Sequence, residues 1–145
     1  MDHITLGRTG ITTSVVGLGA GGPSRIGKSL GIQEHESVAL VRRAYDLGVT
    51  FFDSAESYGT EGYLGKGLTG LADKVCISTK LSCRIDGKVK TPEELEKSLD
   101  ASLERLDRDW VDIYHLHGIV PDEYQEISQK LYPVLERMKE KGKIR

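Results

Sequence analysis

Four short apolar segments that alternate with helical patterns constrain the fold of this chain more than any other feature. They span residues 15–19, 49–53, 75–80 and 111–117, and each is rich in β-branched or aromatic residues. Strands that alternate with helices build a parallel sheet, because each helix carries the chain back to the end of the sheet where the previous strand began. The pattern therefore predicts an α/β fold, and both a doubly wound sheet and part of a barrel satisfy it.

Helices are expected between and after these strands. Residues 34–47 carry an apolar stripe at helical spacing, and residues 61–71 form a shorter, glycine-diluted candidate. Thr91 followed by Pro92 and Glu94 is the start signal of a helix that runs through 106. A last helix is expected to begin near Pro133, with residues 127–131 as a separate lead-in.

A hairpin is expected ahead of the first strand. Residues 4–6 and 11–13 are short β-type segments, and they flank the turn-forming residues 7–10. The hairpin precedes the four strand–helix units and completes the expected architecture.

The size and composition of the chain limit its class. It has 145 residues, of which 38% are hydrophobic and 29% charged, so one domain spanning residues 1–145 with a sizeable core is expected. The net charge of −2 argues against nucleic-acid binding, and no apolar stretch is long enough for a membrane span. Two cysteines and no signal segment behind Met1 predict a cytoplasmic protein. A closed eight-stranded β/α barrel needs about 250 residues, so the chain holds at most part of one.

Chemically active residues stand at the carboxyl ends of three consecutive predicted strands. Asp53 ends the second strand and Tyr58 lies in the loop behind it, Lys80 ends the third strand, and His117 ends the fourth. Each of these residues alone has an ordinary structural explanation, such as a loop cap or a solvated strand end. Because the carboxyl ends of parallel strands meet at one edge of the sheet, the four side chains are nevertheless expected to converge there.

These four residue types suit the reduction of a carbonyl group. A tyrosine has a pKa near 10 and is a weak acid unless a nearby cation stabilises its phenolate. Lys80 is placed to supply that cation and Asp53 to hold it, while His117 is placed to donate a hydrogen bond to a carbonyl oxygen. Together they place a proton donor beside a group that orients a carbonyl. This arrangement suits the reduction of a carbonyl once a hydride donor is present.

Motifs spread over nearly the whole chain resemble the aldo-keto reductases. The segment Phe52-Asp53-Ser54-Ala55-Glu56-Ser57-Tyr58-Gly59 resembles the signature of that family, and residues 77–80 resemble its lysine strand. Residues 102–117 resemble its histidine segment, and residues 5–10 resemble the hairpin that closes the base of its barrel. Residues 142–145 resemble the start of its fifth strand.

The resemblance implies the first four βα units, plus the N-terminal hairpin, of a (β/α)8 TIM-barrel type, truncated before strand five. It implies an enzyme that uses NADPH to reduce an aldehyde or ketone to an alcohol. In that enzyme Tyr58 is the general acid and Lys80 its modulator, with Asp53 as partner of the lysine and His117 orienting the carbonyl. His115 departs from the pattern, since the family more often has an uncharged residue there.

The resemblance also divides the cofactor site. It implies that Asp53 and the backbone at Gly21 and Gly22 touch the nicotinamide end, and that the adenosine contacts lie beyond Arg145. Little or no turnover is therefore expected from this chain alone. The outer strands of its sheet are expected to pair, through self-association or with a missing half.

Two other functions fit parts of the sequence. A half-barrel of this type could act as a non-catalytic interaction module. Residues 22–29 also satisfy the phosphate-binding loop pattern G-x-x-x-x-G-K-S, which raises a nucleotide-binding alternative. That loop should open a helix at Lys28 and Ser29, whereas Gly31 follows closely and the helical stripe begins only near residue 34.

Two further patterns resemble binding sites. Residues 17–22 spell G-x-G-x-x-G but are followed by Pro23 rather than by a helix, so a flexible exit from the strand is preferred to a dinucleotide loop. His115 and His117 face the same side of a strand, as a metal-binding pair does, but the chain has only two other histidines, on remote segments. No metal site is therefore predicted.

Overall fold

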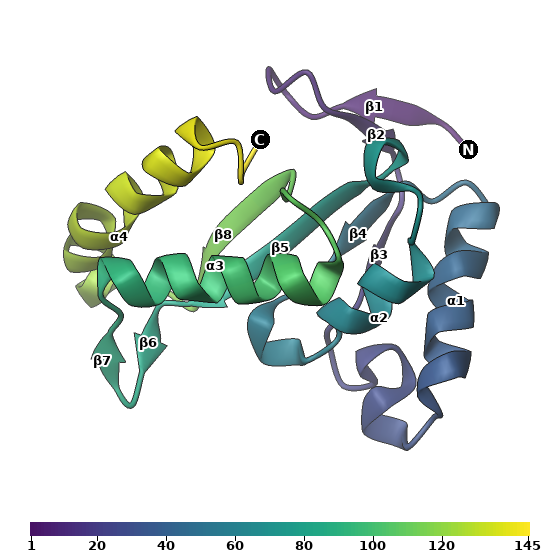
Figure 1. Ribbon diagram of the computed structural model, residues 1–145, viewed down its shortest axis with the longest axis horizontal. Coiled ribbons are helices and arrows are strands. Elements are labelled where there is room, and N and C mark those ends of the chain that lie inside the picture. The colour runs from purple at the N-terminus through teal and green to yellow at the C-terminus, as the bar shows by residue number, and fades with distance from the viewer.

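A four-stranded parallel sheet forms the centre of the computed structural model, which describes residues 1–145 (Figure 1). Its strand order, β3-β4-β5-β8, follows the order of the chain. In register, Gly19 lies opposite Asp53, Asp53 opposite Ser78, and Ser78 opposite Ile113. The strands are β3 (Gly17–Gly19), β4 (Phe51–Asp53), β5 (Cys76–Ser82) and β8 (Ile113–His117).

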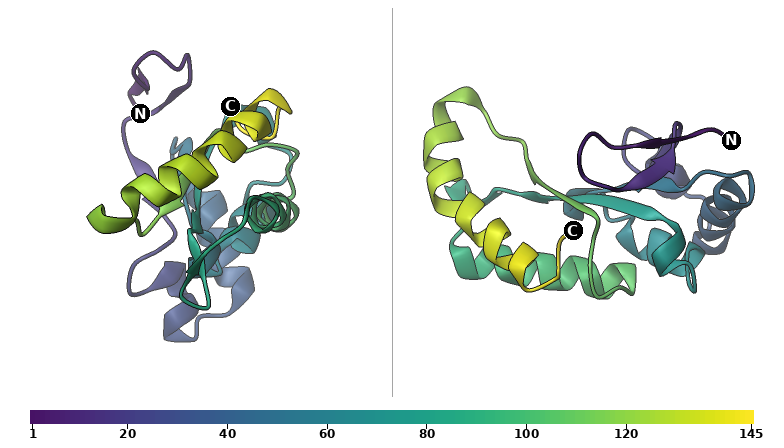
Figure 2. Two further views of the ribbon diagram at one scale, coloured as in Figure 1. Left: turned by 90° about the vertical axis from the view of Figure 1, so that its left-hand side faces the viewer. Right: turned by 90° about the horizontal axis from the view of Figure 1, so that it is seen from above.

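Four helices connect and follow these strands. Consecutive helices pack against one another, α1 on α2, α2 on α3 and α3 on α4, and α3 also packs on β5 (Figures 1 and 2). A sheet whose order never reverses, with helices layered in sequence around it, is a section of a barrel rather than a doubly wound sheet. The helices are α1 (Glu34–Asp46), α2 (Glu61–Gly67), α3 (Pro92–Leu106) and α4 (Tyr124–Glu140). Short 3₁₀ turns are η1 (Arg25–Leu30), η2 (Glu56–Tyr58), η3 (Ala72–Lys74) and η4 (Pro121–Glu123). None of the helices is long and apolar enough to cross a membrane.

The start of α3 confirms the capping box read from the sequence. The Thr91 hydroxyl accepts a hydrogen bond from the backbone N–H of Glu94 at 3.2 Å, and the Glu94 carboxylate accepts one from the Thr91 N–H at 2.7 Å. Leucines at helical spacing then bury one face of the helix against the core.

Helix α2 ends at Gly67, earlier than the expected residue 71. Its glycines allow close packing on both neighbouring helices. A Cβ on Gly65 would lie 2.6 Å from the Arg105 carbonyl oxygen of α3, and one on Gly67 would lie 2.7 Å from the Val41 side chain of α1. The glycines that weaken this helix are therefore needed where α1, α2 and α3 meet.

The prediction that the last helix begins near Pro133 was wrong. Helix α4 is continuous from Tyr124 to Glu140 with Pro133 inside it. A proline removes one hydrogen bond of the helix, but Ile127 and Leu131 before it and Val134 and Met138 after it are all buried. Burial of one apolar face on both sides of the exposed proline outweighs that local cost.

The expected N-terminal hairpin is present and lies at the amino ends of the parallel strands. It consists of β1 (His3–Thr5) and β2 (Thr12–Ser14). Ser14 and Thr50 exchange two hydrogen bonds of 2.8 Å, backbone N–H to side-chain oxygen in each direction, immediately before β4. At the same end, Ile144 forms a parallel bridge with Val111 beside β8. The hairpin therefore lies at the amino ends of the parallel strands and does not cover their carboxyl ends.

A second small hairpin, which the sequence interpretation missed, follows β5. Strands β6 (Arg84–Ile85) and β7 (Lys88–Val89) pair antiparallel around Asp86 and Gly87, which have φ values of 50° and 75°. Asp-Gly is the usual sequence of such a two-residue turn, so a local signal for it existed.

Candidate active site

The four residues predicted to act together meet at the carboxyl edge of the sheet. The Lys80 ammonium group lies 2.6 Å from Asp53 Oδ2 and 5.2 Å from the centre of the Tyr58 ring. The Tyr58 and His117 rings meet edge to face, with centres 5.8 Å apart and planes at 88°. Asp53 comes from β4, Lys80 from β5, His117 from the end of β8 and Tyr58 from η2. Strand β5 continues to Ser82, so Lys80 stands within the strand rather than at its end.

Two acceptors hold the lysine in place. Lys80 Nζ donates to Asp53 Oδ2 and, at 2.7 Å, to the backbone carbonyl of Ser54. Its side chain is only 17% exposed, and that of Asp53 is 33% exposed. Charge-assisted hydrogen bonds in a partly desolvated site restrict the ammonium group far more than a surface pair would. The site therefore holds a fixed positive charge beside a phenol.

Gly21 makes room for the Tyr58 ring. A Cβ at this position would lie 2.4 Å from Tyr58 Cε2, so the Tyr58 ring would have to move from its observed place. Gly22 has φ of 70° and open space beside its Cα. The packing of Tyr58 thus accounts for the glycine at 21, and cofactor contact at either glycine stays a prediction.

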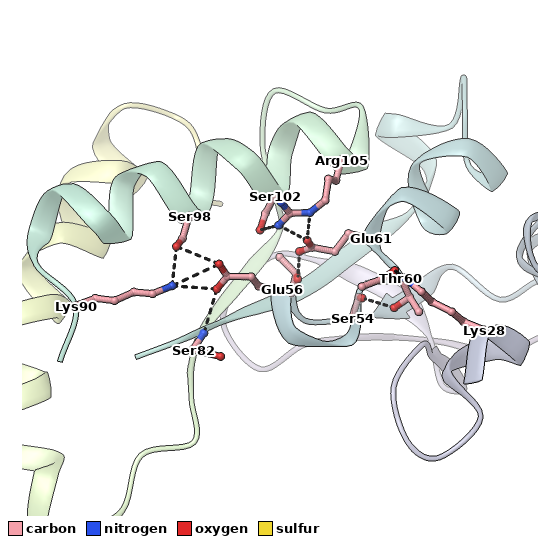
Figure 3. Close-up of polar contacts among 12 residues, drawn as sticks. Lys28, Ser54, Glu56, Thr60, Glu61, Ser82, Lys90, Ser98, Ser102 and Arg105 are labelled. Carbon is pink, nitrogen blue, oxygen red and sulfur yellow. Dashed lines mark hydrogen bonds and ion pairs between the residues drawn. The ribbon is translucent and has the colours of Figure 1, made fainter. Parts of the chain in front are cut away.

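A partly buried cluster supports the turn that carries Tyr58, and sequence reasoning missed it (Figure 3). The Glu56 carboxylate in η2 lies 3.1 Å from Lys90 Nζ and 3.2 Å from the Ser98 hydroxyl of α3. It also accepts the backbone N–H of Ser82 at 3.3 Å. Lys90 is 5% exposed and donates to Ser98 at 2.7 Å. The cluster ties the Tyr58 turn to β5 and α3, and Glu56 and Ser98 are 42 residues apart in sequence, so no local pattern could have revealed it.

A second cluster anchors the end of the same loop (Figure 3). The carboxylate of Glu61, which is fully buried, accepts hydrogen bonds from Thr79 Oγ1 at 2.6 Å and from Arg105 Nε at 2.8 Å. Nearby, the Thr60 hydroxyl donates to the Ala20 carbonyl at 3.1 Å and lies 2.9 Å from the Ser54 hydroxyl. The loop between Asp53 and α2 is therefore fixed at both ends.

The phosphate-loop interpretation of residues 22–29 is not supported. Residues 25–30 form the 3₁₀ turn η1, with Arg25 and Ile26 in left-handed conformation, and no α-helix opens at Lys28. The Lys28 ammonium group donates to the Gly59 carbonyl at 2.6 Å and lies 5.6 Å from the centre of the Tyr63 ring. Lys28 thus fastens η1 to the Tyr58 loop. The overlapping G-x-G-x-x-G is likewise followed by this turn rather than by a helix.

His115 lies on the inner face beside the lysine. Its Nε2 is 3.2 Å from the Ser78 hydroxyl, which donates to Asp53 Oδ1 at 2.8 Å. Partial desolvation lowers the pKa of His115, and the positive charge of Lys80 lowers it further. Ser78 was not among the predicted site residues, although the alternation of β5 places it on the same face as Lys80 and could have indicated it.

Comparison with known proteins decides the family. The model of the Aldo/keto reductase family matches residues 16–145. The chain belongs to this family. The resemblance of its motifs to the aldo-keto reductases is therefore confirmed.

Its relatives are about twice as long as the chain itself. The chain is 40% identical to L-galactose dehydrogenase of Arabidopsis thaliana over 147 residues, which cover 97% of the chain and 45% of the relative. It is 32% identical to the aldo-keto reductase YhdN of Bacillus subtilis (strain 168), over all of the chain and 45% of that protein. The chain thus spans about half the length of the curated relatives it matches.

Solved aldo-keto reductases share the fold. The thermostable aldo-keto reductase Tm1743 superposes with a TM-score of 0.80 at 30% identity, over 99% of this chain and 52% of the other. An aldo-keto reductase from Klebsiella pneumoniae in complex with NADPH gives 0.71 at 29% identity, over 92% and 44%. The predicted TIM-barrel type is confirmed, with the chain corresponding to part of the barrel.

Proposed function

We propose that this chain supplies the proton donor and the carbonyl-orienting group of an NADPH-dependent enzyme that reduces an aldehyde or ketone to an alcohol. One observation carries the proposal. Lys80, hydrogen-bonded to Asp53 at 2.6 Å, holds its ammonium group 5.2 Å from the centre of the Tyr58 ring, and the His117 ring meets the Tyr58 ring edge to face. A phenol, a fixed cation and an imidazole on one open rim form the apparatus of acid catalysis at a carbonyl.

Each residue then has a defined task. The Tyr58 hydroxyl donates its proton to the carbonyl oxygen as negative charge develops there. Lys80 stabilises the phenolate left behind, and its bonds to Asp53 and to the Ser54 carbonyl prevent it from turning away. His117 donates a hydrogen bond to the same carbonyl oxygen and so fixes the carbonyl relative to Tyr58. NADPH, when bound, supplies the hydride that adds to the carbonyl carbon.

The residues present suit the nicotinamide end of the cofactor. The Asp53 carboxylate is partly exposed at the rim, and the backbone at Gly22 is open to close approach because a Cβ built there would meet no atom within 4 Å. NADPH as the donor is supported by the Klebsiella pneumoniae structure, which is a complex with NADPH. The contacts to the rest of the cofactor belong, in this proposal, to the other half of the barrel.

The same groups serve the reverse direction, in which Tyr58 accepts the proton of an alcohol. The name of the Arabidopsis thaliana relative, L-galactose dehydrogenase, supports testing sugars as well as simple carbonyls. We further propose that the outer strands β3 and β8 pair with the remaining strands of a barrel, and that the protein works in the cytoplasm, where its two free, buried cysteines stay reduced.

The experiment combines cofactor titration with one pair of variants. NADPH is titrated against the purified chain while nicotinamide fluorescence is followed, and turnover is measured with an aldehyde and NADPH and, in the reverse direction, with L-galactose and NADP⁺. Tyr58→Phe should abolish turnover and leave NADPH affinity within about twofold, because it removes the acidic hydroxyl group and keeps the ring. Tyr124→Phe, in which an exposed tyrosine of α4 loses the same hydroxyl, is the matched control and should change neither.

Three results would decide between the proposal and its alternatives. Turnover retained in Tyr58→Phe would refute the acid assignment. Absence of NADPH binding at high micromolar concentration would show that this chain is not an independent enzyme and favour the interaction module. Binding of ATP that is lost in Lys28→Ala would instead restore the nucleotide-binding alternative.

A further inference from the structure

A line of hydrogen bonds runs beneath the catalytic lysine and crosses three neighbouring strands. It begins at His115 in β8, whose Nε2 lies 3.2 Å from the Ser78 hydroxyl in β5. Ser78 Oγ lies 2.8 Å from Asp53 Oδ1 in β4, and Asp53 Oδ2 lies 2.6 Å from Lys80 Nζ. The register of the sheet makes this possible, because Ser78 pairs with Asp53 on one side and Lys80 pairs with His115 on the other.

The direction of each hydrogen bond follows from the number of hydrogens available. An ionised carboxylate only accepts, so the single hydroxyl hydrogen of Ser78 goes to Asp53. Ser78 Oγ then has only lone pairs to offer His115, and His115 Nε2 must carry the hydrogen. The neutral ring is thus assigned as the Nε2–H tautomer, and all donors in the line point toward Asp53.

The line occupies both oxygens of the Asp53 carboxylate. Oδ1 is held by Ser78 and Oδ2 by Lys80, so the carboxylate cannot rotate without breaking one of the two bonds. A carboxylate fixed in this way fixes the ammonium group that it binds. Removal of Ser78 or His115 should therefore leave the Asp53–Lys80 ion pair in place but allow the Asp53 carboxylate to rotate.

The charges around His115 favour the neutral ring. Lys80 and His117 lower its pKa and Asp53 raises it, with partial desolvation as the largest cause of the net decrease. A second cation beside Lys80 is thereby avoided at neutral pH, and the ring remains a neutral donor.

We propose that His115 and Ser78 are positioning residues that orient the Asp53–Lys80 pair toward Tyr58. Neither touches substrate in this scheme. Their value for catalysis rests on the proposed carbonyl reduction, whereas the hydrogen-bonded line itself does not depend on it.

The test measures the order of the Lys80 ammonium group directly, by ¹H–¹⁵N NMR of the lysine side chains in the 145-residue chain. Lys80→Arg assigns the signal. In the unmodified chain the Lys80 ammonium signal should be sharp and protected from exchange. Ser78→Ala and His115→Leu should broaden or remove it, whereas His115→Gln, whose amide keeps a donor, should retain it. Ser128→Ala on α4 is the control for loss of an exposed hydroxyl.

Backbone amide spectra of each variant show whether the fold is intact, and His115→Gln keeps the test decisive if His115→Leu misfolds. An unchanged Lys80 signal in Ser78→Ala would overturn the proposal, and so would a disordered Lys80 ammonium in the unmodified chain. In a preparation that reduces a carbonyl substrate measurably, Ser78→Ala should lower kcat about tenfold with KM nearly unchanged. This is the effect expected for one lost hydrogen bond to a charged group. Turnover retained in Tyr58→Phe would count against the proposed function and leave the NMR result valid.

Discussion

Replacement of Glu61 by alanine should strongly destabilise the fold. The Glu61 carboxylate has no solvent exposure and joins three elements: its own helix α2, β5 through Thr79, and α3 through Arg105. The guanidinium group contacts it twice, at 2.8 Å from Nε and 2.7 Å from Nη2. Loss of the Glu61 carboxylate removes both the acceptor of the buried Thr79 hydroxyl and the ion-pair partner of Arg105.

The expected cost follows from these contacts. Breaking a buried ion pair by removing one partner typically costs about 3–5 kcal/mol. The Arg105 side chain is 40% exposed and regains water once freed, which reduces its share of that cost. The buried Thr79 hydroxyl loses its acceptor, which costs about 1–3 kcal/mol. We therefore expect a decrease of about 3 kcal/mol in the free energy of unfolding.

Urea unfolding followed by circular dichroism measures this decrease. With a slope of about 2 kcal/mol/M, the midpoint should fall by about 1.5 M and the slope should stay constant. Glu96→Ala is the matched control, because Glu96 pairs loosely with Arg137 at 3.5 Å and Lys141 at 3.8 Å on the surface. That substitution should cost less than about 1 kcal/mol. If Glu61→Ala shifts the midpoint no more than Glu96→Ala, the structural reasoning is refuted.

Three further predictions test other parts of the structure. Gly21→Ala should destabilise the chain by about 1–3 kcal/mol because its Cβ would lie 2.4 Å from the Tyr58 ring, while Gly19→Ala, with open space, should stay within about 0.5 kcal/mol in the same unfolding assay. Pro133→Ala should raise the thermal midpoint, since it restores a hydrogen bond inside α4, and an unchanged or lower midpoint would show that the proline is not a local weakness. Both cysteines are buried, and burial raises the pKa of the Cys76 thiol to about 12, so neither should react with a thiol reagent at pH 8 until urea unfolds the chain. Rapid labelling of the folded chain would contradict this.

Local patterns accounted for most elements of the fold. The capping box at Thr91 predicted the start of α3, and period and turn signals located the four parallel strands and the first hairpin, because these depend on residues close in sequence. The start of α4 was misplaced because burial on both sides of Pro133 overrides the local preference of proline. The second hairpin was missed although Asp86-Gly87 carried its signal.

The sequence by itself determined the family, the order of strands and helices, and the convergence of Asp53, Tyr58, Lys80 and His117. It did so because carboxyl ends of parallel strands necessarily share one edge. Only the tertiary structure decided which side chains hold these residues in position. Glu56 meets Ser98 across 42 residues, and His115 meets Ser78 across 37, and such pairs depend on strand register and helix packing that no local pattern contains. The order of the strands therefore brings the four residues together. The orientation of their side chains is set by contacts that form only when the sheet and its helices pack together.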